Sequence, residues 1–367
     1  MRPNGTDPSS SSGGDGEHGW SRVTSMARWL ARRRPPAVAT PAMSVVMPVY
    51  NAAATLAECL TRLFQSTFVD FEVVLVDDGS TDQSPAIAAN FPVRIVPTSG
   101  RVGPAAARNV GARAAHGPLL FFIDSDVMVG PDTLARLADR YARGDVDGLI
   151  GVQAAAMRHR DLVSQYKNLW MRWTYVRQTG EVPLFYTTAA AIRREAFLST
   201  GGFDEGYGNP NVEDTAFGQK LARLGIRVRV QPELEVEHVK RYSLAGLLRT
   251  DFLRAVALAR LKLRHRAELA RNNTSIPASY IVSVPVAAAG AGALVAAPVL
   301  GAPALGGAGL VALAGAIALN ANFLAAIRAS DGWGRALAAV PVLWLELLVV
   351  GAGMALGLLT FPCGRRY

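Results

Sequence analysis

The C-terminal quarter of the chain is almost free of charged side chains. No charged side chain lies between Arg271 and Arg328, and Glu346 is the only one within residues 336–364. A helix of about 20 apolar residues spans the hydrocarbon core of a bilayer. We therefore expect a transmembrane region over residues 273–367, with about three helices. Their expected ranges are 276–297, 304–327 and 337–360.

The number of spans has an alternative. Pro285, Pro298 and Pro303 lie among Gly and Ala residues, and small residues favour close helix packing in lipid. A re-entrant pair of helices is therefore an alternative to two full spans. Glu346 is costly to bury in a bilayer. A functional role, a structural hydrogen bond and a position near the interface are all consistent with its sequence context.

The arginines around these apolar segments indicate an orientation. Arg264, Arg266 and Arg271 precede the first expected span, and Arg328 and Arg335 lie between the second and third. The positive-inside rule places both groups on the cytosolic side, although two further arginines near the C-terminus count against three spans. No N-terminal stretch has the pattern of a cleaved secretory signal. We expect a multi-pass protein of the inner cell membrane with a cytoplasmic soluble domain.

The segment before the first span, residues 243–272, places apolar residues near a helical period with Arg and Lys between them. This pattern is typical of an amphipathic helix that lies in the headgroup plane of a membrane. A soluble amphipathic helix packed on the preceding domain is the alternative.

Composition sets further limits. Residues 1–19 are mostly Ser, Gly, Asp and Pro and cannot bury enough apolar surface to fold, so residues 1–40 are expected to be a disordered, basic segment. The net charge of +9 comes with no compact basic patch interleaved with aromatic residues, so we expect no nucleic acid partner. Cys59 and Cys363 are far apart in sequence and are interpreted as ordinary thiols.

Residues 41–242 alternate short apolar runs with helical patterns. The runs "MSVVMPV", "FEVVLVDD", "VRIVP" and "LLFFIDSD" are expected to be strands. Continuous apolar strands separated by helices predict an α/β domain with a mostly parallel sheet and helices on both faces. Ligands of such sheets bind at the carboxyl ends of the strands.

Polar clusters follow three of these strands. They are "PVYN" from Pro48, "DDGSTD" from Asp77 and "DSD" from Asp124. Asp124 and Asp126 repel each other unless a cation or donors neutralise them. Hard oxygen ligands suit Mg²⁺ or Mn²⁺, with water and phosphate oxygens filling the other positions. We therefore expect a divalent metal that bridges a diphosphate. Helix capping is the alternative for Asp78 and for the last Asp of "DDGSTD".

Four segments together resemble the family 2 glycosyltransferases with the GT-A fold. They are "SVVMPVYNAAATLAECLTRLFQST", "EVVLVDDGSTD", "GPAAARNVGARAAHGPLLFFIDSDV" and "GGFDEGYGNPNVEDTAFGQKLARLG", in order within residues 43–240. The resemblance implies a metal-dependent enzyme of hexosyltransferase type that uses a nucleotide-sugar donor.

The resemblance also implies roles for individual residues. Those implied to bind the donor are Pro48, Tyr50, Asn51, Asp77, Asp78, Arg108, Asn109 and Asp124. The metal ligands are expected to be Asp124, Asp126 and His238. Asp214 is the implied catalytic base and Glu213 an orienting or acceptor-binding group. The alternatives are packing for Tyr50, a sheet-edge ion pair for Arg108, helix-start charge for Glu213 and an exposed strand end for His238.

A base on one face of the donor sugar and a diphosphate leaving from the other give a single displacement with inversion. A "QxxRW" motif is absent from the sequence, which favours transfer of one sugar over processive synthesis. The expected acceptor is a lipid-linked molecule or a glycan at the cytosolic face of the membrane, in cell envelope glycan synthesis. A catalytically inactive nucleotide-sugar-binding protein and a metal-dependent phosphohydrolase are the alternatives.

Overall fold

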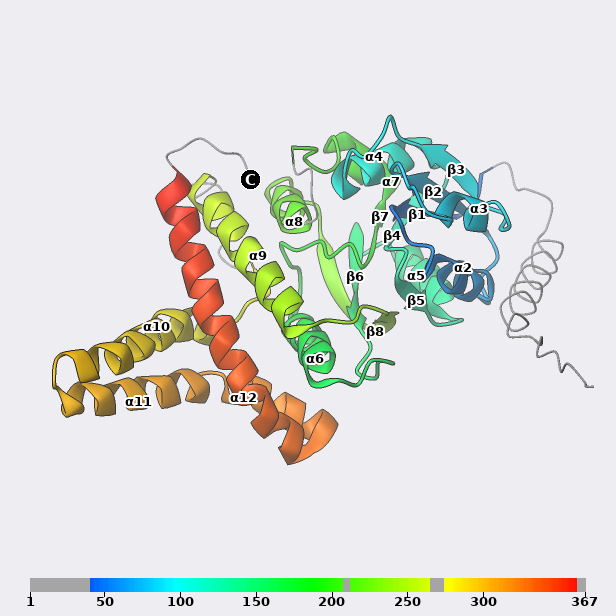
Figure 1. Ribbon diagram of the computed structural model, residues 1–367. Coiled ribbons are helices and arrows are strands. Elements are labelled where there is room, and N and C mark those ends of the chain that lie inside the picture. Colours follow the sequence, from blue (N-terminus) through cyan, green and yellow to red (C-terminus); the bar gives the residue numbers. More distant parts are fainter. Residues whose placement is uncertain (1–39, 207–211, 265–273, 362–367) are drawn as a thin grey trace, which may run out of the picture.

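The computed structural model describes residues 40–206, 212–264 and 274–361. The predicted N-terminal segment, Arg266, Arg271 and part of the "GGFDEGYGNPN" loop lie outside these ranges. The described part is an α/β domain followed by four long helices (Figure 1).

Eight strands form one sheet in the order β3-β2-β1-β4-β7-β6-β8-β5. Their bounds are β1 Met43–Val49, β2 Phe71–Asp77, β3 Arg94–Pro97, β4 Leu119–Ile123, β5 Val127–Val129, β6 Gly148–Gln153, β7 Ala189–Arg193 and β8 Val228–His238. Neighbours from β3 to β4 are parallel, as expected from their apolar runs. The sheet becomes mixed beyond β4, because β7 is antiparallel to both neighbours and β5 is antiparallel to β8.

Helices cover both faces of the sheet (Figure 1). Those of the α/β domain are α2 Leu56–Phe64, α3 Ser84–Ala88, α4 Pro104–Ala114, α5 Thr133–Ala142, α6 Leu162–Val176, α7 Arg194–Ser199 and α8 Glu213–Arg223. Successive residues of β1 point to opposite faces, so Val46 joins one buried cluster while Val45 and Met47 join the other. Both faces are therefore dry, which explains the continuous apolar strands.

The remaining helices are α9 Leu244–Arg264, α10 Ala278–Val299, α11 Pro303–Ala318 and α12 Ala321–Thr360. The helices α10 and α11 form a hairpin that projects from the molecule, and the C-terminal part of α12 runs beside α9 (Figure 1). By length and composition, α10 and α12 are the two described helices able to cross a membrane. The single helix predicted over 304–327 is wrong, because the chain turns at Asn320 between α11 and α12.

The amphipathic segment does form a helix, α9, but α12 covers part of it. The contact is close: a Cβ at Gly353 of α12 would lie 2.5 Å from the carbonyl oxygen of Phe252, and one at Gly357 would lie 2.7 Å from that of Val256. Leu253 on α9 is exposed. Aromatic rings connect the C-terminal helices to the α/β domain. The ring centroids of Trp170 of α6 and Tyr280 of α10 lie 4.7 Å apart.

Candidate active site

The parallel strands β1, β2 and β4 bring the predicted polar clusters to one edge of the sheet. Val49 at the end of β1 is in register with Asp77 at the end of β2, and the Asp78 N–H donates to the Val49 carbonyl at 2.8 Å. Asp124 follows the last residue of β4, which pairs with the other side of β1. Side chains from three separate sequence motifs therefore surround a common edge, as the sequence predicted.

The turn after β1 and the turn after β2 hold each other. The Thr81 N–H donates to Asn51 Oδ1 at 2.8 Å, and the Ser80 N–H donates to Asp77 Oδ1 at 3.0 Å. Asn51 has a φ of 50°, a left-handed conformation that Asn tolerates better than most residues. The adjacent Tyr50 is 40% exposed, and the Arg101 guanidinium lies 4.4 Å from its ring centroid. This arrangement places an aromatic ring and a cation beside the carboxyl ends of β1 and β2. Pro48 is half-buried in β1.

Asp78 is buried and holds the loop that leads into α4. Its carboxylate accepts hydrogen bonds from the N–H groups of Val102 and Gly103, both at 2.9 Å, and from the Thr98 hydroxyl at 3.1 Å. Gly103 has a φ of 92°, which suits glycine alone among common residues. Direct contact of Asp78 with a donor stays a prediction.

Arg108 on α4 connects the end of β4 to the start of α8. Its Nη2 lies 2.8 Å from Asp124 Oδ1 and its Nη1 lies 3.2 Å from Glu213 Oε1, and the guanidinium is almost completely buried. Burial raises the pKa of Asp124, and the charge of Arg108 opposes that rise. The ion pairs bring together three predicted residues that are distant in sequence, with a carboxylate on each side of one cation.

Asn109 is also buried, next to Arg108. Its amide nitrogen donates to the Phe203 carbonyl at 2.9 Å and to Glu205 Oε1 at 2.9 Å, while its amide oxygen accepts from the Phe203 N–H at 2.9 Å. These bonds fix the loop that precedes the "GYGNPN" segment. Its predicted role in donor binding remains a prediction, and the structure gives it a role in holding this loop.

Asp126 and His238 meet at the junction of β5 and β8. Asp126 Oδ2 lies 3.2 Å from His238 Nε2, and the strand pair aligns Val127 with His238. Burial opposes ionisation of Asp126, but the hydrogen bond and charge of His238 lower its pKa. Among the residues that the structure describes, no three His, Cys, Asp or Glu side chains form a metal-binding cluster. A carboxylate and an imidazole are nevertheless in contact there.

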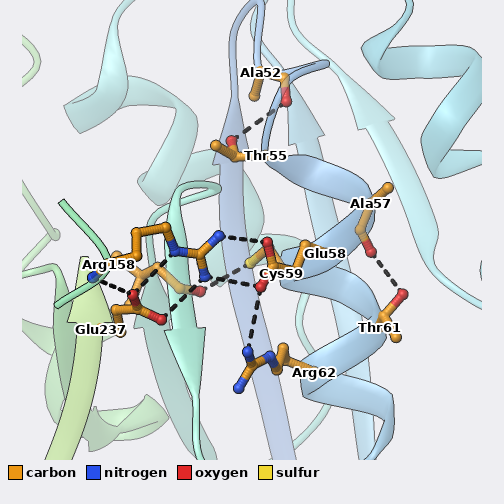
Figure 2. Close-up of polar contacts among 10 residues, drawn as sticks. Ala52, Thr55, Ala57, Glu58, Cys59, Thr61, Arg62, Arg158 and Glu237 are labelled. Atoms are coloured by element: carbon orange, nitrogen blue, oxygen red, sulfur yellow. Dashed lines mark hydrogen bonds and ion pairs between the residues drawn. The ribbon is translucent and has the colours of Figure 1, made fainter. Parts of the chain in front are cut away.

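An ion cluster around Arg158 lies next to this junction in the chain fold (Figure 2). Arg158 Nη1 lies 2.7 Å from Glu58 Oε2 on α2, and its Nε lies 3.0 Å from Glu237 Oε1, next to His238. The Cys59 thiol donates to the Val127 carbonyl at 3.1 Å. Helix α2, the loop after β6 and the end of β8 are thus joined around the "DSD" turn.

Asp214 lies in the first turn of α8, beside Glu213, and is buried. Its Oδ1 accepts from the Thr215 N–H at 2.6 Å, and its Oδ2 lies 3.8 Å from Arg254 Nη2 on α9. Burial raises the pKa of Asp214 to about 6, and the Arg254 guanidinium opposes the shift. A carboxylate with a pKa near neutrality is suited to accept a proton.

Comparison with known proteins agrees with this geometry. Residues 44–200 match the family model for glycosyl transferase family 2. The chain carries a family 2 glycosyltransferase domain. It is 35% identical over 114 residues to a glycosyltransferase of Streptococcus pneumoniae, and this alignment covers 30% of this chain and 38% of that protein. It is 30% identical over 244 residues to a validoxylamine A glucosyltransferase of Streptomyces hygroscopicus, covering 55% of this chain and 57% of that protein.

The alignments span about a third to somewhat over half of these relatives. A solved mannosyltransferase from Pyrobaculum calidifontis, in complex with GDP-Man and Mn²⁺, superposes with a TM-score of 0.54 at 22% identity, over 94% of both chains. This similarity confirms the predicted GT-A fold.

Two residues of the candidate site were not predicted from the sequence. Arg254 belongs to the amphipathic segment, whose pattern predicts cations that face a membrane, and its contact with Asp214 joins residues that are 40 positions apart in the sequence. Arg101 lies in a loop with no motif signal. An arginine that follows "TSG" and precedes "VGP" has no sequence feature that distinguishes a ring contact from solvent exposure.

Proposed function

We propose that this protein transfers a single hexose, with inversion, from a nucleotide-sugar to an acceptor at the cytosolic face of a membrane. The observation that carries the proposal is the pair of carboxylates on either side of Arg108, one from the strand-end "DSD" turn and one from the "ED" start of α8. The family match and the relatives named as glycosyltransferases support it, and they favour it over a phosphohydrolase.

In this proposal the edge formed by β1 and β2 receives the nucleoside. Tyr50 offers a ring face for stacking, and Asp77 and Asn51 shape the turn that faces the base. The buried Arg108 guanidinium supplies a fixed positive charge toward the diphosphate. Such a preorganised charge stabilises the negative charge that develops on a leaving group.

The side chains available as metal ligands at the "DSD" turn fit Mg²⁺ or Mn²⁺. Asp126 and His238 are already in contact and Asp124 is in the same turn, and carboxylate ligands with open positions suit these ions, while an imidazole nitrogen suits a transition metal such as Mn²⁺ better than Mg²⁺. When bound, a divalent ion supplies positive charge to the diphosphate. The mannosyltransferase neighbour was solved with GDP-Man and Mn²⁺.

Asp214 is proposed to remove the proton from the attacking acceptor oxygen. That oxygen forms a bond to the anomeric carbon, the bond from this carbon to the donor phosphate breaks, and the nucleoside diphosphate leaves. Glu213 remains on Arg108 and orients the helix start. The apolar helices α10 and α12 are proposed to anchor the domain in a membrane as a multi-pass region.

The test uses membranes that contain the full chain, with a panel of radiolabelled nucleotide-sugars and separation of lipid from aqueous products. We expect one donor to label an acceptor, and Asp214→Asn to lower transfer by about 10³-fold, because a positioned base contributes about 10²–10⁴, while donor binding persists. Asp139→Asn, an exposed change on α5, is the matched control. Transfer that survives in Asp214→Asn would assign the base elsewhere, and donor binding without transfer in the natural chain would indicate a binding protein.

A further inference from the structure

A cavity of about 140 Å³ lies among α6, α9, α10 and α12 and reaches Thr215 at the start of α8. Most of its wall is apolar. Its apolar lining includes Trp170, Met171, Ile281, Val284, Val350 and Met354. Because α10 and α12 are the described helices able to cross a membrane, part of this wall comes from the segments expected to contact lipid, and the rest comes mainly from α6 and α9. The donor site needs none of these side chains.

The cavity reaches the candidate base at its polar end. Thr215 lines it, and both the N–H and the hydroxyl of Thr215 donate to Asp214 Oδ1. Arg254 also lines it, 3.8 Å from Asp214 Oδ2. Asp214 therefore contacts two residues of the cavity wall, and its neighbour Glu213 forms one of the Arg108 ion pairs.

The charged residues that line the cavity are Lys167, Arg254, Lys262, Asp251 and Glu346. Lys167 is paired with the buried Asp251, with 2.6 Å between Nζ and Oδ1. Lys262 lines the same cavity, and no carboxylate lies within ion-pair distance of it among residues 40–206, 212–264 and 274–361. Arg254 and Lys262 lie eight residues apart on α9, a spacing that puts both on one side of the helix. Arg254 already faces Asp214, so an anionic group at this end would chiefly offset the charge of Lys262.

We propose that this cavity binds the acceptor, and that the acceptor is a lipid monophosphate. The inference rests on the proposed function and names the acceptor of that same site. The first carbons of the hydrocarbon chain lie against the apolar wall, and the phosphate lies at Arg254 and Lys262. A phosphate oxygen attacks the anomeric carbon, its proton passes to Asp214, and the nucleoside diphosphate departs with the electrons of the broken carbon–oxygen bond. The product is a lipid phosphate sugar.

The first test measures equilibrium binding of radiolabelled farnesyl monophosphate to the full-length protein in detergent, without donor or metal. Unlabelled farnesyl monophosphate is expected to compete, and farnesol and inorganic phosphate to compete at least tenfold more weakly. Farnesol that competes equally would overturn the phosphate assignment. Inorganic phosphate that competes equally would reduce the site to a simple anion site and overturn the lipid assignment.

The second test blocks the cavity. Ile281 lines it and is 38% exposed, whereas its neighbour Val282 is 52% exposed and does not line it. Ile281→Trp is expected to weaken farnesyl monophosphate binding at least tenfold, and Val282→Trp to leave it unchanged. Both changes are at partly exposed positions of α10, so loss of folding is not the expected effect of either. Equal binding by the two variants would contradict the proposal.

The third test removes charge. Lys262→Gln is expected to weaken binding of farnesyl monophosphate about fivefold and to leave the weak binding of farnesol unchanged, whereas Arg249→Gln, an exposed change on the same helix, affects neither. A Lys262→Gln variant that binds both ligands as the natural chain does would overturn the head-group assignment. These measurements need no sugar transfer, so they test lipid binding in the cavity even if the proposed enzymatic activity proves wrong. Asp214→Asn tests that activity separately.

Discussion

The strand-end edge and the helical layer of α9 and α12 meet at the start of α8, where Arg108 contacts Glu213 and Arg254 of α9 contacts Asp214, and they differ in how their charges are held. At the edge, Arg108 is buried within the α/β domain between two carboxylates of that domain. In the layer, Arg254 comes from a helix whose own position depends on close packing against α12. The comparison teaches that the proposed donor side is organised by the domain alone, whereas the surroundings of the proposed base are completed by the segment next to the expected membrane region.

The largest effect is expected at the edge. Arg108→Met would leave Asp124 and Glu213 without their shared cation, and removing one partner of a buried pair costs about 3–5 kcal/mol. We expect a loss of stability of about 3 kcal/mol and loss of donor binding, read by thermal unfolding and by nucleotide-sugar titration. Arg113→Met on the exposed side of the same helix should change neither. Retained donor binding in Arg108→Met would show that the edge does not depend on this residue.

A smaller loss is expected in the layer. Gly353→Ala places a methyl group 2.5 Å from a backbone oxygen of α9, and overpacking of this kind costs about 1–3 kcal/mol. The thermal unfolding temperature should fall and transfer should fall with it, while donor affinity is kept. Gly292→Ala, where a Cβ meets nothing within 4 Å, is the control. If donor affinity falls as strongly as transfer, the two regions are not separable.

The smallest effect concerns the pH profile, where the two regions meet. Asp214 must be ionised to accept a proton, and burial raises its pKa to about 6. The transfer rate should therefore fall as the pH drops below about 6. The charges that face Asp214 are Arg254 from α9, Arg108 from α4 and the adjacent Glu213. Arg254→Gln removes a cation that lowers the pKa, so the acid limb should move to higher pH, as measured in initial rates across pH. An unmoved limb would show that another group sets it.

The sequence predicted the edge well because its signals are local. An apolar run that ends in acids, as at "LLFFIDSD", predicts both the strand and its polar end. Parallel pairing of the strands then brings Asp77 and Asp124 to the same edge of the sheet. The antiparallel strand β7 was not predicted, since "TTAAAIRR" has no alternation and a single bulky apolar residue, Ile192. The break between α11 and α12 was missed as well, because hydropathy does not register the turn at Asn320.

The contact of Arg254 with Asp214 has a practical consequence for anyone who shortens the chain. A version that ends at Tyr242 keeps the whole sheet, the "DSD" turn and both acids of α8. It loses the guanidinium beside Asp214 and uncovers Trp170 and Tyr175, which now lie against the helical layer. Such a version should still bind nucleotide-sugar, and it would be a misleading guide to how the intact protein recognises its acceptor.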